Sequence, residues 1–381
     1  MTNWKTACLL AALLSATLLS AQTPTPSDAQ ALERQGRLPE AAEAWKAITT
    51  HNPRDAAAFA SWGVVLSKQE NYQEAASAYK KALALNPNLP GIQLNLGLAE
   101  FKQGRFPEAI PPLRAALAAD SHSMQARTLL GLSYYGTKRF AEAAKYLKVA
   151  AQAEPNNLEL HQVLAQSCLW TRDNDCAVKE FQQILRQNPD SAAAHMLMGE
   201  ALDGLERSAD AIAEFQAAVK AAPQEPGVHF GLGYLYWKAH QYDQAKAEFE
   251  AELGIDPGNA QALAYLGDIE LKLNNPEKAL ALLQKAVQQK NDLRIAYADI
   301  GAIYMDQKQY EEALAAFQRA VKLDPEQPDM HFRLGNLYRV MGNTSASQEE
   351  FAKSRALHKK ADDALLKKIS DAPPALHQQV P

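Results

Sequence analysis

The sequence predicts an all-α solenoid of helix pairs, and three observations support this prediction. Residues 22–361 divide into ten consecutive repeats of 34 residues with no insertion between them. Small and bulky residues recur at fixed positions of each repeat. Proline stands at position 32 in seven of the ten repeats, where it ends a helix. Because each repeat buries surface only against its neighbours, we expect one elongated array instead of several globular domains.

Residues 1–21, before the first repeat, have the features of a secretory signal peptide. A positive charge at Lys5 precedes an uncharged apolar run, and small residues lead to a cleavage site after Ala21. The run is shorter than the roughly 20 residues that a membrane-spanning helix needs. We therefore expect a cleaved leader and an exported protein, periplasmic or secreted. An uncleaved N-terminal membrane anchor is the alternative.

The pattern inside the repeats predicts two tightly packed antiparallel helices. Position 8 is glycine in eight repeats and alanine in two, position 20 is alanine in nine, and position 24 is always bulky. Glycine inside a helix costs about 1 kcal/mol relative to alanine, so its recurrence indicates close helix approach. The predicted repeats are 22–55, 56–89, 90–123, 124–157, 158–191, 192–225, 226–259, 260–293, 294–327 and 328–361.

The joints between the two helices of a repeat show turn chemistry. Gly36, Gly104 and Gly342 stand at the joint, and Asn71 and Asn274 mark two others. Glycine and asparagine adopt the backbone conformations that such turns require. Pro39 and Pro107 stand where a second helix would begin, a place that tolerates proline.

These residues resemble the tetratricopeptide repeat (TPR) family, and the resemblance covers about residues 22–361. It implies a right-handed superhelix of antiparallel helix pairs, with the first helix of each repeat lining an inner groove. The departures from the family pattern are Asp28, Asn174, Ser208, Ser347 and Lys359. Terminal repeats are expected to be more polar, which accounts for those in the first and last repeats.

The segment after the last repeat predicts a cap. Residues 353–370 should continue as a helix that covers the last apolar face. Residues 362–381 thus comprise the end of this capping helix and a polar tail that is expected to be disordered after Pro373 and Pro374.

The resemblance also implies which residues face the groove, namely positions 2, 5, 9 and 12 of each repeat. The candidate partner-binding residues are Phe101, Tyr135, Trp170, Glu200, Asp203, Phe230, Tyr234, Trp237 and Phe332. Phe230, Tyr234 and Trp237 share one helical face, and aromatic side chains are frequent binding anchors. The alternative is that this stripe packs against the neighbouring groove walls.

Acidic residues in the middle of the array suggest the chemistry of a partner. Glu159, Glu200 and Asp203 would attract a segment with apolar anchors followed by Lys or Arg, although a solvated acidic face is the alternative. Some TPR domains hold a C-terminal carboxylate with basic residues on successive first helices. Ala60 and Leu94 occupy such positions here, so that mode is disfavoured.

Two cysteines and four histidines are candidates for structural roles. Cys168 and Cys176 flank the turn of the fifth repeat, and in an oxidising compartment we predict a disulfide between them. Two separate buried thiols or a redox pair are the alternatives. The histidines share position 4 of their repeats, and three of them lie in adjacent repeats, whose spacing of about 8–10 Å does not suit one metal ion. We expect packing roles and no metal site for His161, His195, His229 and His331.

Composition and motifs argue against several functions. The net charge of −5 argues against nucleic-acid binding. Gly231 and Gly233 lie inside a predicted helix and therefore do not form a dinucleotide loop. The repeats occupy nearly all of the chain after the leader, so we expect a non-catalytic protein without a cofactor.

The predicted function is a protein-interaction scaffold outside the cytosol. It would bind an extended or helical partner segment in its groove, within a cell-envelope assembly. The alternative is a solenoid that binds a glycan or peptidoglycan fragment, with Tyr234 and Trp237 stacking on sugar rings.

Overall fold

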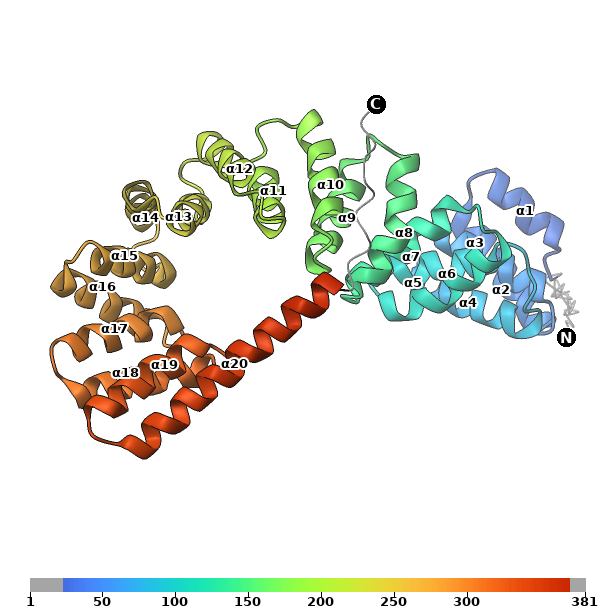
Figure 1. Cartoon of the computed structure of the whole chain (residues 1–381). Coiled ribbons are helices and arrows are strands. Elements are labelled where there is room, and N and C mark those ends of the chain that lie inside the picture. The colour runs from blue at the N-terminus through green and yellow to red at the C-terminus, as the bar shows by residue number, and fades with distance from the viewer. Residues whose placement is uncertain (1–22, 371–381) are drawn as a thin grey trace, which may run out of the picture. The chain divides into compact units, whose positions relative to one another are not determined.

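A computed structural model describes residues 23–370, which form helices joined by short turns (Figure 1). The predicted signal peptide and the end of the predicted tail lie outside the described residues. The chain divides into two compact bodies, an N-terminal body that ends at Thr171 and a C-terminal body that begins at Arg172. The division falls inside the fifth repeat, between its two helices.

The N-terminal body contains nine of the described helices. They are α1 (Pro26–Arg34), α2 (Leu38–His51), α3 (Ala56–Lys68), α4 (Tyr72–Leu85), α5 (Ile92–Lys102), α6 (Phe106–Ala119), α7 (Met124–Gly136), α8 (Phe140–Ala153) and α9 (Leu158–Trp170).

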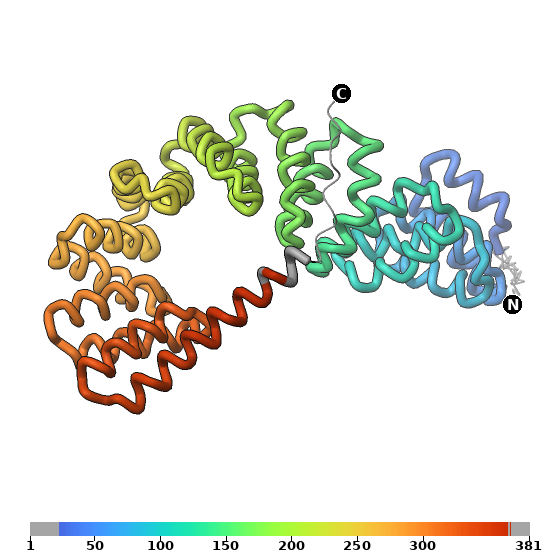
Figure 2. Tube along the Cα trace, in the orientation of Figure 1, coloured from blue at the N-terminus to red at the C-terminus, as the bar shows by residue number. Residues whose placement is uncertain are grey.

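The C-terminal body contains the remaining eleven described helices. They are α10 (Asn174–Gln187), α11 (Ala192–Gly204), α12 (Ser208–Ala221), α13 (Val228–Lys238), α14 (Tyr242–Ile255), α15 (Ala260–Lys272), α16 (Pro276–Gln289), α17 (Arg294–Asp306), α18 (Tyr310–Leu323), α19 (Pro328–Val340) and α20 (Thr344–Ser370). The last helix, α20, is much longer than the others (Figure 2). No helix in residues 23–370 is both long and apolar enough to cross a membrane.

Helices pack in the order of the chain within each body. The odd-numbered first helix of a repeat contacts the even-numbered second helix, as α3 contacts α4 and α13 contacts α14. First helices of successive repeats also contact each other, as α5 contacts α7 and α13 contacts α15. First helices therefore lie together on one side of each body, which we call the groove face. This arrangement is the all-α solenoid that the repeat pattern predicts.

The glycines at position 8 allow the close helix approach that the sequence indicates. A Cβ atom added to Gly97 would lie 2.5 Å from Cγ of Leu113, the bulky residue at position 24 of the same repeat. One added to Gly301 would lie 2.6 Å from Cδ1 of Phe317. Non-bonded carbon atoms at these distances would clash. The two helices can therefore keep this separation only with a glycine at position 8 of these repeats.

Position 15, between the two helices of a repeat, has a left-handed backbone in all ten repeats. Three of these residues are glycines, but seven carry side chains, among them Glu70 and Asn274 with φ of 61° and 62°. The turn is thus imposed by the packing of the two helices, since side-chain-bearing residues adopt this conformation at a cost.

Three histidines at position 4 hold their repeats together by a shared arrangement. Nδ1 of His195, His229 and His331 lies 2.6, 2.6 and 2.5 Å from a glutamate oxygen on the second helix of the same repeat. Nε2 of each ring lies 2.9, 3.1 and 3.0 Å from the carbonyl oxygen of the proline at position 32 of the preceding repeat. Each ring therefore bridges the second helix of its own repeat and the loop that precedes that repeat.

Candidate protein-binding groove

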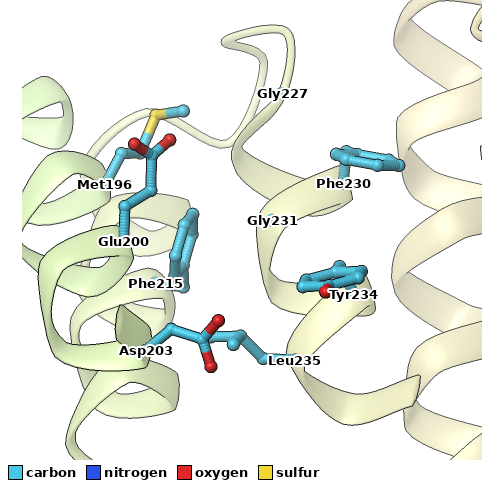
Figure 3. A pocket seen from close by; sticks show the side chains of 9 residues that line it. All are labelled: Met196, Glu200, Asp203, Phe215, Gly227, Phe230, Gly231, Tyr234 and Leu235. Atoms are coloured by element: carbon cyan, nitrogen blue, oxygen red, sulfur yellow. The ribbon is translucent and has the colours of Figure 1, made fainter. Parts of the chain in front are cut away.

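Four of the predicted groove residues line one pocket on the groove face of the C-terminal body. The pocket has a volume of about 410 Å³ and lies between repeats 6 and 7. Its walls come from α11, α12 and α13 and consist of Met196, Glu200, Asp203, Phe215, Gly227, Phe230, Gly231, Tyr234 and Leu235. Glu200 and Phe215 face Phe230 and Tyr234 across the pocket (Figure 3). We call this hollow the acidic pocket.

The acidic pocket exists because repeat 7 has glycine at position 6. A Cβ atom on Gly231 would lie 2.0 Å from Cε1 of Phe215, so any side chain at this position would collide with the ring. The next repeat has Tyr265 at the same position. Its ring stacks on Phe249, which corresponds to Phe215, with ring centroids 5.6 Å apart. In repeat 8 a tyrosine ring covers the ring at position 24, whereas in repeat 7 the glycine leaves the Phe215 ring on the pocket.

A buried glutamate fixes the start of α13 at the edge of the acidic pocket. Glu252 of α14 is 1% exposed, and its carboxylate accepts hydrogen bonds from the backbone N–H groups of Gly227 and Phe230 at 3.0 and 3.2 Å. Gly227 has φ of +91°, a conformation that favours glycine. The amide of Asn259 donates to the same carboxylate at 3.1 Å. Glu252 therefore positions the helix that carries Phe230 and Tyr234.

The two acidic side chains of the pocket, Asp203 and Glu200, differ in their electrostatic surroundings. Asp203 accepts a hydrogen bond from Nζ of Lys238 at 2.6 Å, and this bond raises the pKa of the lysine. Glu200 stands one helical turn away. Part of its surface is open to solvent, yet the surrounding protein desolvates the carboxylate enough to raise its pKa above the usual value. A cation brought by a partner would relieve this penalty.

An aromatic wall borders the acidic pocket on the side of repeat 8. We use this name for Phe230, Tyr234, Trp237 and Tyr265, whose neighbouring ring centroids lie between 4.8 and 6.0 Å apart. Nε1 of Trp237 donates to Oδ2 of Asp268 at 2.5 Å. The wall is therefore held by internal contacts, and Phe230 and Tyr234 still line the pocket.

The predicted groove residues of the N-terminal body form separate aromatic contacts. Phe101 packs edge-on against Phe106 at 5.4 Å, and the hydroxyl of Tyr135 donates to Oε1 of Gln166 at 2.5 Å. The ring of Trp170 stacks on Phe140 with centroids 5.3 Å apart and remains 71% exposed.

The remaining candidates are not among the residues that line the acidic pocket. Phe332 of α19 is 53% exposed and packs against Phe351 of the last helix at 5.6 Å. Cys168 and Cys176 are both buried, in α9 and α10. These two cysteines belong to different bodies, so the disulfide between them stays a prediction.

Sequence reasoning missed three residues that shape the groove. Phe215 lies at position 24, which the repeat pattern assigns to packing, Tyr265 lies at position 6, to which the pattern gives no role, and Glu252 is one of many glutamates on second helices. One signal was available: Gly231 is the sole glycine at position 6 among the ten repeats. A missing side chain at a single repeat indicates a local gap between helices.

Comparison with known families agrees with this architecture. Models described as "TPR repeat" match residues 63–104 and 301–342, and models described as "Tetratricopeptide repeat" match 94–157, 134–201, 192–225 and 230–293. Together these matches cover most of the chain between residues 63 and 342. The chain belongs to the tetratricopeptide repeat family, whose repeats serve as protein-interaction scaffolds.

This chain is also similar to several solved structures. A tetratricopeptide repeat protein from Parabacteroides merdae is 17% identical, covers 65% of this chain and 97% of its own, and has a TM-score of 0.49. YrrB, described as a TPR protein with an unusual peptide-binding site, is 24% identical over 49% of this chain and 97% of its own, with a TM-score of 0.38. MamA MSR-1 C2 is 25% identical over 43% of this chain and 95% of its own, with a TM-score of 0.39. A comparison with curated proteins gave no match.

Proposed function

We propose that this protein is an exported, non-catalytic scaffold that binds a segment of a partner protein on the groove face of its C-terminal body. The observation that carries the proposal is the acidic pocket, which opens between two repeats where Gly231 replaces a side chain. Its walls combine aromatic rings with the carboxylate of Glu200, whose pKa is raised by desolvation. A basic side chain on an apolar segment would satisfy both features.

The chemistry of the pocket suits lysine or arginine. The aliphatic stem of such a side chain would lie between Met196 and Phe215 on one side and Phe230 on the other. Its charged head would reach Glu200 while lying over aromatic rings, and cation–π contacts add about 0.5–2 kcal/mol. A second hollow of about 570 Å³, lined by Met196, Leu197 and Pro226, adjoins the pocket and offers a place for a neighbouring apolar residue.

Site-specific photocrosslinking in the native cell tests this proposal. A benzophenone amino acid replaces Tyr234 in the pocket wall, and the matched control replaces Glu250, which is exposed on α14. We expect a discrete protein adduct at position 234 that disappears when Glu200→Lys is added. Equal labelling at the two positions, or an adduct that persists with Glu200→Lys, would contradict the proposal.

The proposed compartment is the periplasm or the exterior, within a cell-envelope assembly, and rests on the leader sequence. N-terminal sequencing of the protein purified from its own cells should begin at Gln22. A sequence that begins at Met1 in a membrane fraction would favour the uncleaved anchor instead.

Glycan binding is the second candidate, and one observation favours it. Trp170 offers a 71% exposed indole held parallel to Phe140, the geometry that stacks on a sugar ring. Titration with muropeptides while intrinsic tryptophan fluorescence is recorded would test it. A response that Trp170→Ala abolishes would support glycan binding, and an unchanged signal would exclude it for these ligands.

A further inference from the structure

A second pocket lies on the other side of the aromatic wall and has a different charge. It has a volume of about 280 Å³ and is lined by residues of repeats 7, 8 and 9. Trp237 and Tyr265 form its aromatic side, and Lys290, Asp292 and Arg294 supply its charged groups. We call it the basic pocket because two of the three charged side chains in its lining are cations, and the carboxylates nearest them are Asp292 and Asp324.

The two cations are only loosely paired inside the protein. Nζ of Lys290 lies 3.7 Å from Asp292, and Nε of Arg294 lies 3.6 Å from Asp324. Both separations exceed the 2.7–3.2 Å of an ordinary N–H···O hydrogen bond. Ion pairs of this length at a solvated surface contribute little, so their N–H groups can turn toward a better acceptor at small cost.

The acidic and basic pockets share one continuous wall. Tyr234, which lines the acidic pocket, stacks on Trp237, which lines the basic pocket, with centroids 6.0 Å apart. Trp237 in turn packs edge-on against Tyr265 at 4.8 Å. A single segment that crosses these rings would therefore meet a carboxylate at one end and two cations at the other.

We propose that the groove face recognises the charge order of its partner segment. A basic side chain enters the acidic pocket at repeats 6 and 7, apolar residues cover the aromatic wall, and an acidic side chain enters the basic pocket at repeats 8 and 9. This inference rests on the proposed function, and it adds the second anchor and the direction in which the segment lies. Complementary charges at two separate places fix the register of a bound chain and exclude the reversed orientation.

Peptide selection followed by charge exchange tests the inference. The whole chain serves as bait for a displayed library of random dodecapeptides with amidated or fused C-termini, so that side chains supply the only carboxylates. The best peptide is made synthetically, labelled, and measured by fluorescence anisotropy. The variants are Glu200→Lys, the pair Lys290→Glu with Arg294→Glu, and all three together. The controls Glu250→Lys and Lys285→Glu change exposed charges on second helices.

We expect selected peptides to contain one basic and one acidic residue at a fixed separation. Each pocket variant should weaken binding by about tenfold or more, and the controls should change it by less than about twofold. The triple variant should bind a peptide with the two charges exchanged, which a misfolded variant could not do.

The outcomes separate this inference from the proposed function. One outcome is that binding is weakened by Glu200→Lys but has the same affinity for the Lys290→Glu/Arg294→Glu variant as for the unmodified protein. It would overturn the second anchor and leave the proposed function standing. Two outcomes would count against both proposals. In the first, the selected peptides bind every pocket variant as tightly as the unmodified protein. In the second, the unmodified protein enriches no peptide more strongly than the triple variant does when each is used as bait.

Discussion

Replacing Asp299 by asparagine should remove a large pH dependence from the stability of the C-terminal body. Asp299 of α17 is 7% exposed, and its Oδ2 atom has no hydrogen-bond partner in the described part of the chain. Burial is the main cause that raises its pKa to about 7, and the charge of Asp268 on α15 raises it further. Lys272 and Arg333 oppose the rise without cancelling it.

The direction and the size of this pH effect on stability follow from the pKa values of Asp299 in the unfolded and the folded chain. An aspartate in the unfolded chain titrates at 3.8, against about 7 in the fold. Between these values the folded chain keeps a proton that the unfolded chain has lost, so the free energy of unfolding falls as the pH rises. A difference of about three pH units, at 1.36 kcal/mol each, corresponds to about 4 kcal/mol. The loss should be complete above about pH 7, and asparagine at this position should show none of it.

Amide hydrogen exchange suits this prediction because a solenoid opens locally. The free energy of opening of α17, corrected for intrinsic exchange, is measured between pH 4.5 and 8. The control is Asp306→Asn, an exposed aspartate on the same helix. We expect the curve of Asp299→Asn to diverge from the unmodified protein by several kcal/mol as the pH rises. Curves that stay parallel within about 0.5 kcal/mol would refute a raised pKa at Asp299.

Three further predictions address the pocket and the cysteines. Gly231→Ala should lower the free energy of unfolding by about 1–3 kcal/mol and abolish crosslinking at the acidic pocket, because the methyl group overlaps a phenylalanine ring 2.0 Å away. The control is Gly254→Ala, at a position with open space around it. This variant should be neutral or stabilise the protein by up to about 1 kcal/mol in thermal unfolding. Glu252→Ala should destabilise the start of α13 by about 3 kcal/mol, seen as faster amide exchange there, because buried donors lose their acceptor. Thiol titration of the unreduced, leader-free protein should detect neither Cys168 nor Cys176, and two titratable thiols would contradict the predicted disulfide.

The architecture was predictable because its causes recur in every repeat. Close approach of two helices requires a small residue at position 8 and a bulky one at position 24. This pair of residue types recurs in all ten repeats, so it can be recognised from the sequence alone. The turn at position 15 was only partly visible. Its left-handed backbone is present in all repeats, but residues such as Lys138 and Lys308 carry no sequence signal of it. Helix packing on both sides imposes that conformation.

The groove was predictable as a surface but not as a pocket. Glu200, Asp203, Phe230 and Tyr234 were placed on one face by repeat position, and they do line one hollow. The hollow itself depends on which residue of one repeat meets which residue of the preceding one. That pairing, position 6 against position 24, becomes visible only when the stacking of successive repeats is known.

The histidines show where pattern reasoning could have gone further. His161, His195, His229 and His331 occupy position 4 in the four repeats that carry glutamate at position 23, and the other six repeats have neither residue. Joint presence and joint absence within one chain indicate a direct contact, and the structure shows that contact for His195, His229 and His331 at 2.5–2.6 Å. A contact that recurs between repeats can therefore be inferred from the sequence by comparing positions in pairs. Gly231, Glu252 and Asp299 each act in a single repeat, so no second copy exists against which to compare them, and such single departures from the pattern are where a repeat array acquires a specific site.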